Sequence, residues 1–111
     1  MRQIERQMNF ALSNKGNWSG SNTSVSYHPS ENLSEVRLHG NLIAWLDHTK
    51  QTLALSSCGW YSNTTKSRLN ALLSEFTYNG LSLVQRNWTW FLRDNDFTNK
   101  ALVPFVSGMT V

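Results

Sequence analysis

Residues 35–47 read Glu-Val-Arg-Leu-His-Gly-Asn-Leu-Ile-Ala-Trp-Leu-Asp. Apolar and polar side chains alternate along this stretch, which is the period of a β-strand with one face on a core. One face collects Val36, Leu38, Gly40, Leu42, Ala44 and Leu46, and the other collects Arg37, His39, Asn41, Ile43, Trp45 and Asp47. Gly40-Asn41 interrupts the pattern as a tight turn or as a β-bulge, and we expect the bulge, which would give one long bent strand.

Strand patterns recur on both sides of this stretch. After a polar turn at 47–51, Leu53 and Leu55 repeat the alternation, as an antiparallel partner strand requires. In 81–92 the apolar residues Val84, Trp88, Trp90 and Leu92 share one face with Arg86 among them, which predicts a second long strand. Further strands are expected at 23–27, 52–56 and 102–111, the last with Pro104 near its start and Gly108 as a bend.

Two segments have helical spacing instead. Residues 64–76 place Leu69, Leu72, Leu73 and Phe76 on one side, with N-cap candidates in Ser62-Asn63-Thr64-Thr65 and Asn79-Gly80 as a left-handed stop. A shorter helix is expected at 2–12, where Ile4, Met8, Ala11 and Leu12 fall on one side at helical spacing. Together these elements predict one α+β domain over residues 1–111: an antiparallel sheet of four to five strands, the main helix (about 64–76) on one face, and a short N-terminal helix.

Composition places the chain in a reducing compartment. Cys58 is the single cysteine, so no internal disulfide forms, and we expect a buried, inert thiol. The N-terminus lacks the apolar run of a signal peptide, and no stretch approaches the ~20 apolar residues of a membrane span. The formal charge of +3 and pI of about 9.4 permit an anionic partner without requiring one.

No pattern of catalytic or metal-binding residues stands out. His28, His39 and His48 lack the close pairing typical of zinc ligands, and the seven carboxylates are dispersed. Cys58 precedes the predicted helix by too many residues for the helix dipole to activate it. The sequence therefore predicts a protein that is not an enzyme and that has no metal and no cofactor.

Aromatic and basic residues occur together and predict a binding surface. Five tryptophans are present, and about three are expected to lie mainly in the core. Indoles beside cations suit the bases and phosphates of single-stranded nucleic acid, and they equally suit protein–protein hot spots. The candidate partner-binding residues are Arg37, Trp60, Lys66, Arg68, Arg86 and Trp88.

The start of the main helix carries an unusual charge. Lys66 and Arg68 lie near its N-terminus, where the helix dipole is positive and disfavours cations by a few tenths of a kcal/mol or more. Either both side chains reach water, which we expect, or an anion docks between them.

Four motifs carry a family resemblance: His39–Ala44, Leu53–Trp60 around Ser56-Ser57-Cys58-Gly59, Asn63–Asn70, and Gln85–Trp90. In combination they resemble, over about residues 20–111, a small domain of unknown function that bacteriophages and mobile elements encode. The resemblance implies a phage accessory protein in the bacterial host cytoplasm, of a kind that blocks host machinery and defence systems.

These observations lead to one functional expectation and one alternative. We expect a phage-encoded, non-enzymatic protein that interferes with host machinery, as an anti-defence or anti-CRISPR inhibitor would, by binding a nucleic acid or a nucleoprotein complex. The alternative is a protein–protein interaction module or homodimer that binds no nucleic acid, the dimer closing through an edge strand. Neither reading involves a membrane.

Overall fold

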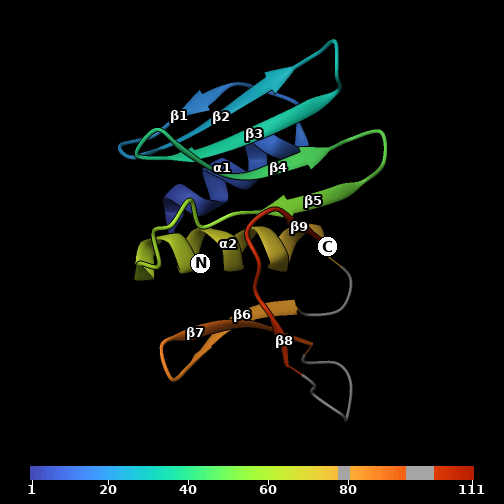
Figure 1. Cartoon of the computed structure of the whole chain (residues 1–111). Coiled ribbons are helices and arrows are strands. Elements are labelled where there is room, and N and C mark those ends of the chain that lie inside the picture. Colours follow the sequence, from blue (N-terminus) through green and yellow to red (C-terminus); the bar gives the residue numbers. More distant parts are fainter. Residues whose placement is uncertain (78–80, 95–101) are drawn as a thin grey trace.

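The computed structural model describes residues 1–77, 81–94 and 102–111 (Figure 1). It has an α+β fold, as predicted, but the strands form two antiparallel sheets where one was expected. The helices are α1 (Gln3–Ser13) and α2 (Asn63–Phe76). The strands are β1 (Trp18–Ser19), β2 (Thr23–His28), β3 (Leu33–Leu38), β4 (Asn41–Asp47), β5 (Thr52–Leu55), β6 (Leu81–Arg86), β7 (Thr89–Asp94), β8 (Leu102–Pro104) and β9 (Met109–Thr110).

The two sheets lie on opposite sides of the helices. The large sheet has six strands in the order β1-β2-β3-β4-β5-β9, and both helices pack on the same face of it (Figure 1). The small sheet has the order β6-β7-β8, and β6 packs against the other side of α2. A helix with an apolar sheet on each side needs apolar residues on most of its circumference, and α2 buries Leu69, Ala71, Leu72 and Leu73.

The expected long strand at 35–47 is instead a hairpin. His39 and Gly40 both have positive φ, 52° and 80°, which is the conformation of the two-residue turns that match the twist of antiparallel strands. A bulge is present, but it lies opposite the step from Val36 to Arg37: Val36 pairs with Ala44 and Arg37 with Leu42, so Ile43 is an extra residue in β4. The extra residue breaks the alternation, so the consecutive residues Ile43 and Ala44 are both buried. The prediction that Ile43 lies on the outer face was wrong.

The expected long strand at 81–92 is also a hairpin. Asn87 and Trp88, both with positive φ, form the turn that joins β6 to β7. Register pairs Leu83 with Leu92, so these two share the face toward α2, and Trp90 is buried beside them. The predicted grouping of Val84 with Trp90 and Leu92 was wrong, because a turn of two residues resets which side chains share a face.

The C-terminal segment joins the two sheets. One strand was expected within 102–111, but β8 pairs with β7 in the small sheet and β9 pairs with β5 in the large one. Gly108 is the bend, as predicted, and its φ of +92° is a conformation that side chains with a Cβ rarely adopt. The segment thus connects the two sheets across the edge of the helical layer.

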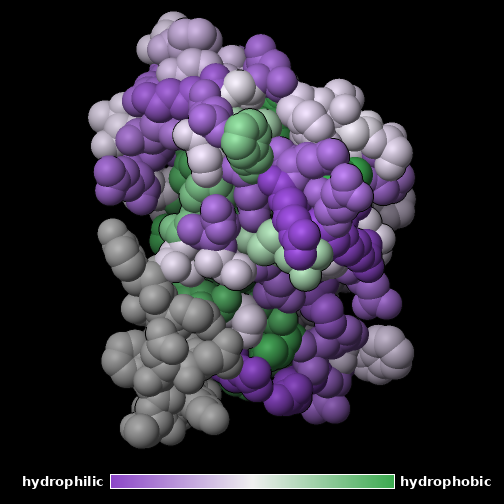
Figure 2. Space-filling model, turned by 180° about the vertical axis from the view of Figure 1, so that it is seen from behind, coloured by the Kyte–Doolittle hydropathy of each residue, from purple (hydrophilic) through white to green (hydrophobic). Residues whose placement is uncertain are grey.

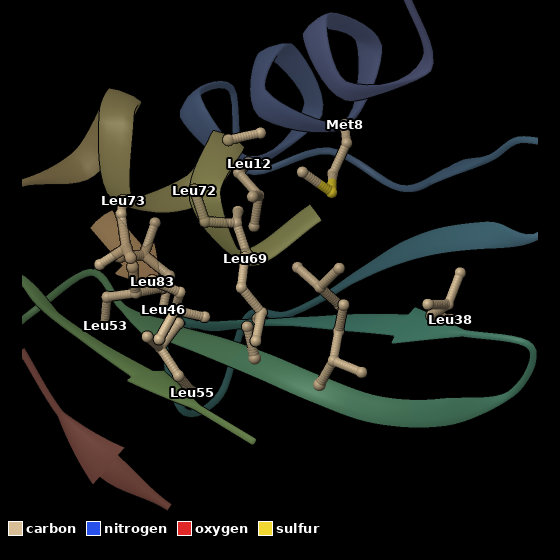
Figure 3. Close-up of a cluster of buried hydrophobic side chains, with 14 of the residues drawn as sticks. Met8, Leu12, Leu38, Leu46, Leu53, Leu55, Leu69, Leu72, Leu73 and Leu83 are labelled. Carbon is tan, nitrogen blue, oxygen red and sulfur yellow. The ribbon is translucent and has the colours of Figure 1, made fainter. Parts of the chain in front are cut away.

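The core lies between the large sheet and the helices (Figure 3). Met8 and Leu12 of α1 and Leu69 and Leu72 of α2 are fully buried, as the helical spacing predicted. Each such side chain contributes roughly 1.5–3 kcal/mol of transfer free energy relative to exposure. Phe76 packs at the margin of the cluster and is only partly buried.

Helix α2 begins at Asn63, directly after the loop 56–62 that follows β5. Its N-cap is Ser62, the first of the four candidates, whose Oγ accepts a hydrogen bond from the backbone N–H of Thr65 at 3.1 Å. Thr77 follows the last turn in an extended conformation. The predicted stop at Asn79-Gly80 lies outside the described residues. Among the residues that are described, no helix is both long and apolar enough to cross a membrane.

Candidate binding surface

The six predicted binding residues do not form one patch. Trp60, Arg86 and Trp88 are exposed, and Lys66 is half-buried on α2. Arg68, on the same helix, is buried, and Arg37 is half-buried on β3 of the large sheet. The structure therefore divides the predicted set, and each part has its own physical reason.

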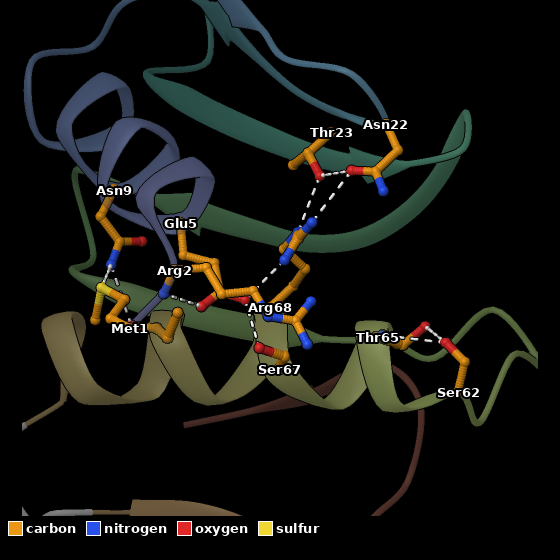
Figure 4. Close-up of polar contacts among 11 residues, drawn as sticks. Met1, Arg2, Glu5, Asn9, Asn22, Thr23, Ser62, Thr65, Ser67 and Arg68 are labelled. Carbon is orange, nitrogen blue, oxygen red and sulfur yellow. Dashed lines mark hydrogen bonds and ion pairs between the residues drawn. The ribbon is translucent and has the colours of Figure 1, made fainter.

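Arg68 is a structural residue, and its assignment to a binding surface was wrong. Its Nη1 donates to Glu5 Oε2 at 2.8 Å, and both side chains are only 3 % exposed. Its Nε donates to Thr23 Oγ1 at 3.0 Å and its Nη2 to Asn22 Oδ1 at 3.2 Å (Figure 4). The guanidinium thereby joins α2 to α1 and to the start of β2. The anion near this helix start is Glu5 of the same chain. The expectation that the Arg68 side chain reaches water was therefore wrong.

The carboxylate of Glu5 is held ionised by its surroundings. Burial raises its pKa, but hydrogen bonds from Ser67, Arg68 and the Arg2 backbone, together with the charge of Arg68, outweigh that effect and lower the pKa overall. Ser67 Oγ donates to Oε2 at 2.6 Å, and the Arg2 N–H donates to Oε1 at 3.2 Å. The pair is thus satisfied on both sides, which a buried ion pair requires.

Arg37 lies on β3 of the large sheet, next to the side chains of Glu35 and His28. Its Nη2 is 3.5 Å from Glu35 Oε1, and His28 Nε2 contacts the same oxygen at 2.7 Å. The Arg37 charge is therefore partly balanced by a neighbour on its own strand. It belongs to the large sheet, whereas the exposed tryptophans belong to the small sheet and the loop before α2.

Trp88 lies beside three aromatic residues that the sequence argument missed, and Trp60 directly precedes one of them, Tyr61, in the chain. We define the aromatic surface as Trp60, Tyr61, Trp88, Trp90 and Phe105. Trp90 is its buried base: the Tyr61 ring packs edge-on against it at 4.9 Å and 79°, and the Phe105 ring at 5.7 Å and 58°. Trp60, Tyr61 and Trp88 are exposed.

A small pocket opens within this aromatic surface. It has a volume of about 220 Å³ and is lined by Tyr61, Trp88, Thr89, Trp90 and Phe105. Phe105 reaches it because its N–H bonds the Trp90 carbonyl at 3.0 Å, which extends the pairing of β8 with β7. Val103 and Val106, on either side of Phe105, are also exposed. No local sequence pattern joins residues 61, 88 and 105, because only the sheet pairing brings them together.

Trp88 is presented to solvent by a strained turn. It is 91 % exposed and has φ +67°, while Asn87 before it has φ +50°. Left-handed backbone suits Asn and Gly, and a bulky residue there costs of order 1–3 kcal/mol. A glycine would adopt this turn without strain, so the presence of tryptophan at position 88 lowers the stability of the fold. Strain of this kind gathers at functional sites.

The expectation that about three of the five indoles lie mainly in the core was too high, because only Trp90 is buried. Trp90 is buried, and Trp18 and Trp45 are half-buried. Trp18 packs against the core cluster from β1. The two that remain exposed, Trp60 and Trp88, are the two that the sequence argument chose.

Reactive groups are few among the described residues. No three His, Cys, Asp or Glu side chains in this part of the chain gather closely enough to hold a metal ion. Cys58 is exposed, so the prediction of a buried thiol was wrong, and its Sγ donates to the Leu42 carbonyl at 2.8 Å. Ser34 Oγ lies 2.8 Å from His48 Nε2, but Ser34 is fully buried and offers no oxygen to a substrate.

Comparison with known proteins identifies the family. Neither curated proteins nor solved structures include a match to this chain. A family model described as "Kyanoviridae Gp96 protein" matches residues 1–111. The match covers the whole printed chain and agrees with the resemblance to a small phage-encoded domain. The chain therefore belongs to the Kyanoviridae Gp96 protein family, a family of small phage-encoded domains.

Proposed function

We propose that this phage protein is a non-enzymatic binding protein that acts in the bacterial host cytoplasm and interferes with host machinery. It docks through its aromatic surface on a host protein or on the protein part of a nucleoprotein complex, and host defence systems such as CRISPR effectors belong to this class of target. The observation that carries the proposal is Trp88, which is 91 % exposed on a left-handed backbone that its side chain disfavours.

The chemistry of the surface favours a protein partner. Trp and Tyr are the residue types that dominate protein–protein hot spots, and here they lie around a pocket that a partner side chain would fill. Val103 and Val106, close to Phe105 in the chain, are exposed apolar residues, and Arg86 is an exposed cation directly before the turn. Two of the predicted cations are absent from this surface, since Arg68 is buried and Arg37 lies on the large sheet.

A host lysate with matched surface variants tests this proposal. The tagged full chain is compared with Trp60→Ser/Trp88→Gly, which removes both exposed indoles, and with Lys50→Ser, which changes an exposed residue in the turn between β4 and β5. We expect a host protein captured by the wild type and by Lys50→Ser and lost with the double variant, with capture unchanged after nuclease treatment. Equal capture by all three chains contradicts the proposal.

Direct binding to single-stranded nucleic acid is a second candidate. An exposed indole at a hairpin tip with Arg86 beside it is a place for one base to stack near one phosphate. A gel-shift series with an oligothymidine DNA and a matched RNA, repeated over a range of salt concentrations, tests it. Retardation that weakens with salt and is lost in Trp88→Ala supports nucleic-acid binding. No retardation at low salt removes it.

A homodimer closed through a strand edge has less support. The outer N–H and C=O of Leu83 on β6 are occupied by the Asn70 side chain, at 2.6 and 3.3 Å. Pro104 on β8 has no N–H to offer, and the Tyr27 N–H on β2 is taken by Asn17 Oδ1 at 2.7 Å. These edges are closed by the means that proteins use to prevent edge-to-edge association. Light scattering at two salt concentrations reads the oligomeric state directly.

A further inference from the structure

A groove runs along the exposed side of α1, apart from the aromatic surface. It has a volume of about 510 Å³, which is within the range of ligand sites. Its apolar lining consists of Phe10, Ala11 and Trp18, which we call the floor. Phe10 is 72 % exposed, which is unusual for a large apolar side chain in the middle of a helix. We call this feature the α1 groove. In Figure 2, which views the side on which α1 lies, apolar groups show among polar side chains.

The Trp18 part of the α1 groove is already ordered in the free protein. A Cβ added to Gly20 would lie 2.9 Å from the Trp18 indole and 3.0 Å from Ile4 Cδ1. The indole therefore occupies space that a side chain at position 20 would otherwise need, and it also packs against the core. A wall that is already ordered costs little entropy on binding.

The rim of the α1 groove is polar and of one charge. Gln3 and Gln7 are four residues apart, so their amides follow one another along the same face of the helix. Each amide offers both donors and an acceptor, which is what a peptide backbone requires. Arg6 is exposed between them. The one acidic residue of α1 is Glu5, which is buried against Arg68, so no carboxylate of this helix balances the Arg6 charge.

The neighbouring sheet edge excludes one mode of binding. The Tyr27 N–H would be an outward donor on β2 beyond the short strand β1, but Asn17 Oδ1 accepts it at 2.7 Å. A peptide beside the groove therefore does not extend the large sheet at this position. Recognition must come from the side chains of the floor and rim.

We propose that the α1 groove binds an extended segment of a protein partner in which an apolar side chain is flanked by carboxylates. The apolar side chain rests on Phe10 and Trp18, a carboxylate pairs with Arg6, and the amides of Gln3 and Gln7 bind the peptide backbone. This site is independent of the proposed function, because α2 lies between the groove and the small sheet. A chain with both sites joins two partners, or holds one partner at two places.

Three capped heptapeptides test the charge and apolar requirements separately. The first is Gly-Ser-Asp-Leu-Asp-Ser-Gly, the second has Ser in place of Leu, and the third has Lys in place of both Asp. Each is titrated to about 1 mM, a concentration that detects weak sites, into the ¹⁵N-labelled full chain. We expect saturable shifts of the Gln7, Phe10 and Trp18 resonances with the first peptide, no shifts with the Ser peptide, and binding weakened by about fivefold or more with the Lys peptide.

Chain variants locate the binding and separate it from folding. Phe10→Ser removes the floor, and Arg6→Gln removes the charge while leaving the floor intact. Both positions are exposed, so thermal unfolding midpoints near that of the wild type are expected and are measured first. Phe10→Ser should abolish the shifts. Arg6→Gln should weaken binding by roughly two- to fivefold and remove its salt dependence.

Several results would overturn the proposal. These are an absence of shifts with the first peptide, shifts of equal size with all three, and shifts confined to residues 60, 88 and 90. Trp60→Ser/Trp88→Gly should bind the first peptide as the wild type does. Loss of peptide binding in that variant would place the peptide on the aromatic surface, whereas loss of host-protein capture alone concerns the proposed function.

Discussion

Arg68 Nη1 on α2 lies 2.8 Å from Glu5 Oε2 on α1, and the two side chains are among the most buried charged groups in the described part of the protein. The pair joins the two helices that pack on the large sheet (Figures 1 and 4). A buried ion pair with satisfied hydrogen bonds is tolerated in the folded state. Removing one partner destabilises the fold, because the other charge then remains buried and unpaired.

Replacement of Arg68 by Ala should destabilise the fold by about 3–5 kcal/mol, because Glu5 then remains as an uncompensated buried charge. Urea unfolding followed by circular dichroism measures the change. Lys66→Ala, on the same helix but half-buried, should change the free energy of unfolding by no more than about 0.5 kcal/mol. A loss at Arg68 below about 1 kcal/mol would show that the network is not what holds α1 against α2.

Acid should weaken the fold through Glu5. Its pKa in the folded protein is below the ordinary value of 4.5, so protons bind the unfolded chain more readily than the folded one. The contribution of this carboxylate is therefore fully present above pH 4.5 and is lost as pH falls below that value. Unfolding free energies from pH 7 to 3 should fall more steeply for the wild type than for Glu5→Gln. Parallel curves for the two proteins would contradict the assignment.

His48 should add a separate loss at milder acidity. Burial, followed by the charge of Lys15, lowers its pKa below the ordinary 6.5, with Asp47 acting in the opposite sense. A histidine with a depressed folded pKa contributes stability above its unfolded pKa that disappears as pH falls through 6.5. His48→Gln should therefore reduce the fall in unfolding free energy as the pH drops from 7 to below 6.5. A slope equal to that of the wild type would refute this.

Substitution of Trp88 should separate stability from binding. Trp88→Gly relieves the left-handed strain and should raise the free energy of unfolding by about 0.5–1 kcal/mol, whereas Trp88→Ala keeps a Cβ and should gain nothing. Both variants should lose the host partner in the capture experiment. Urea unfolding is the measurement, and a glycine variant less stable than the alanine variant would show that the left-handed backbone at position 88 does not strain a residue with a Cβ.

The sequence anticipated the elements with local signals and missed the points where strands turn. The helix over 64–76 and its buried stripe are confirmed, because helical spacing over four turns has one interpretation. The alternation over 35–47 suits a long strand and a hairpin equally well. Gly40 indicated a turn or a bulge without deciding between them, and Asn41-Leu42 and Thr89-Trp90 continue the strand pattern directly after the turn residues.

The candidate site shows the same division. Exposure of Trp60 and Trp88 agrees with the sequence argument, whereas Arg68 was misassigned because its partner Glu5 is 63 residues away in the chain. Tyr61 and Phe105 were missed because they join the aromatic surface only through the pairing of β7 with the C-terminal segment. Contacts between distant positions have no periodic signature in a single sequence.

From the amino-acid sequence alone follow the α+β class, the two helices with their apolar faces, most of the strand segments and the presence of exposed indoles. These depend on neighbours within a few residues, where the periods of helix and strand act. The division into two sheets, the burial of Arg68 with Glu5, and the gathering of Trp88, Tyr61 and Phe105 depend on which apolar faces pack together. Burial in a closely packed interior is a property of the whole chain, so these features were decided only when the sheets closed around the helices.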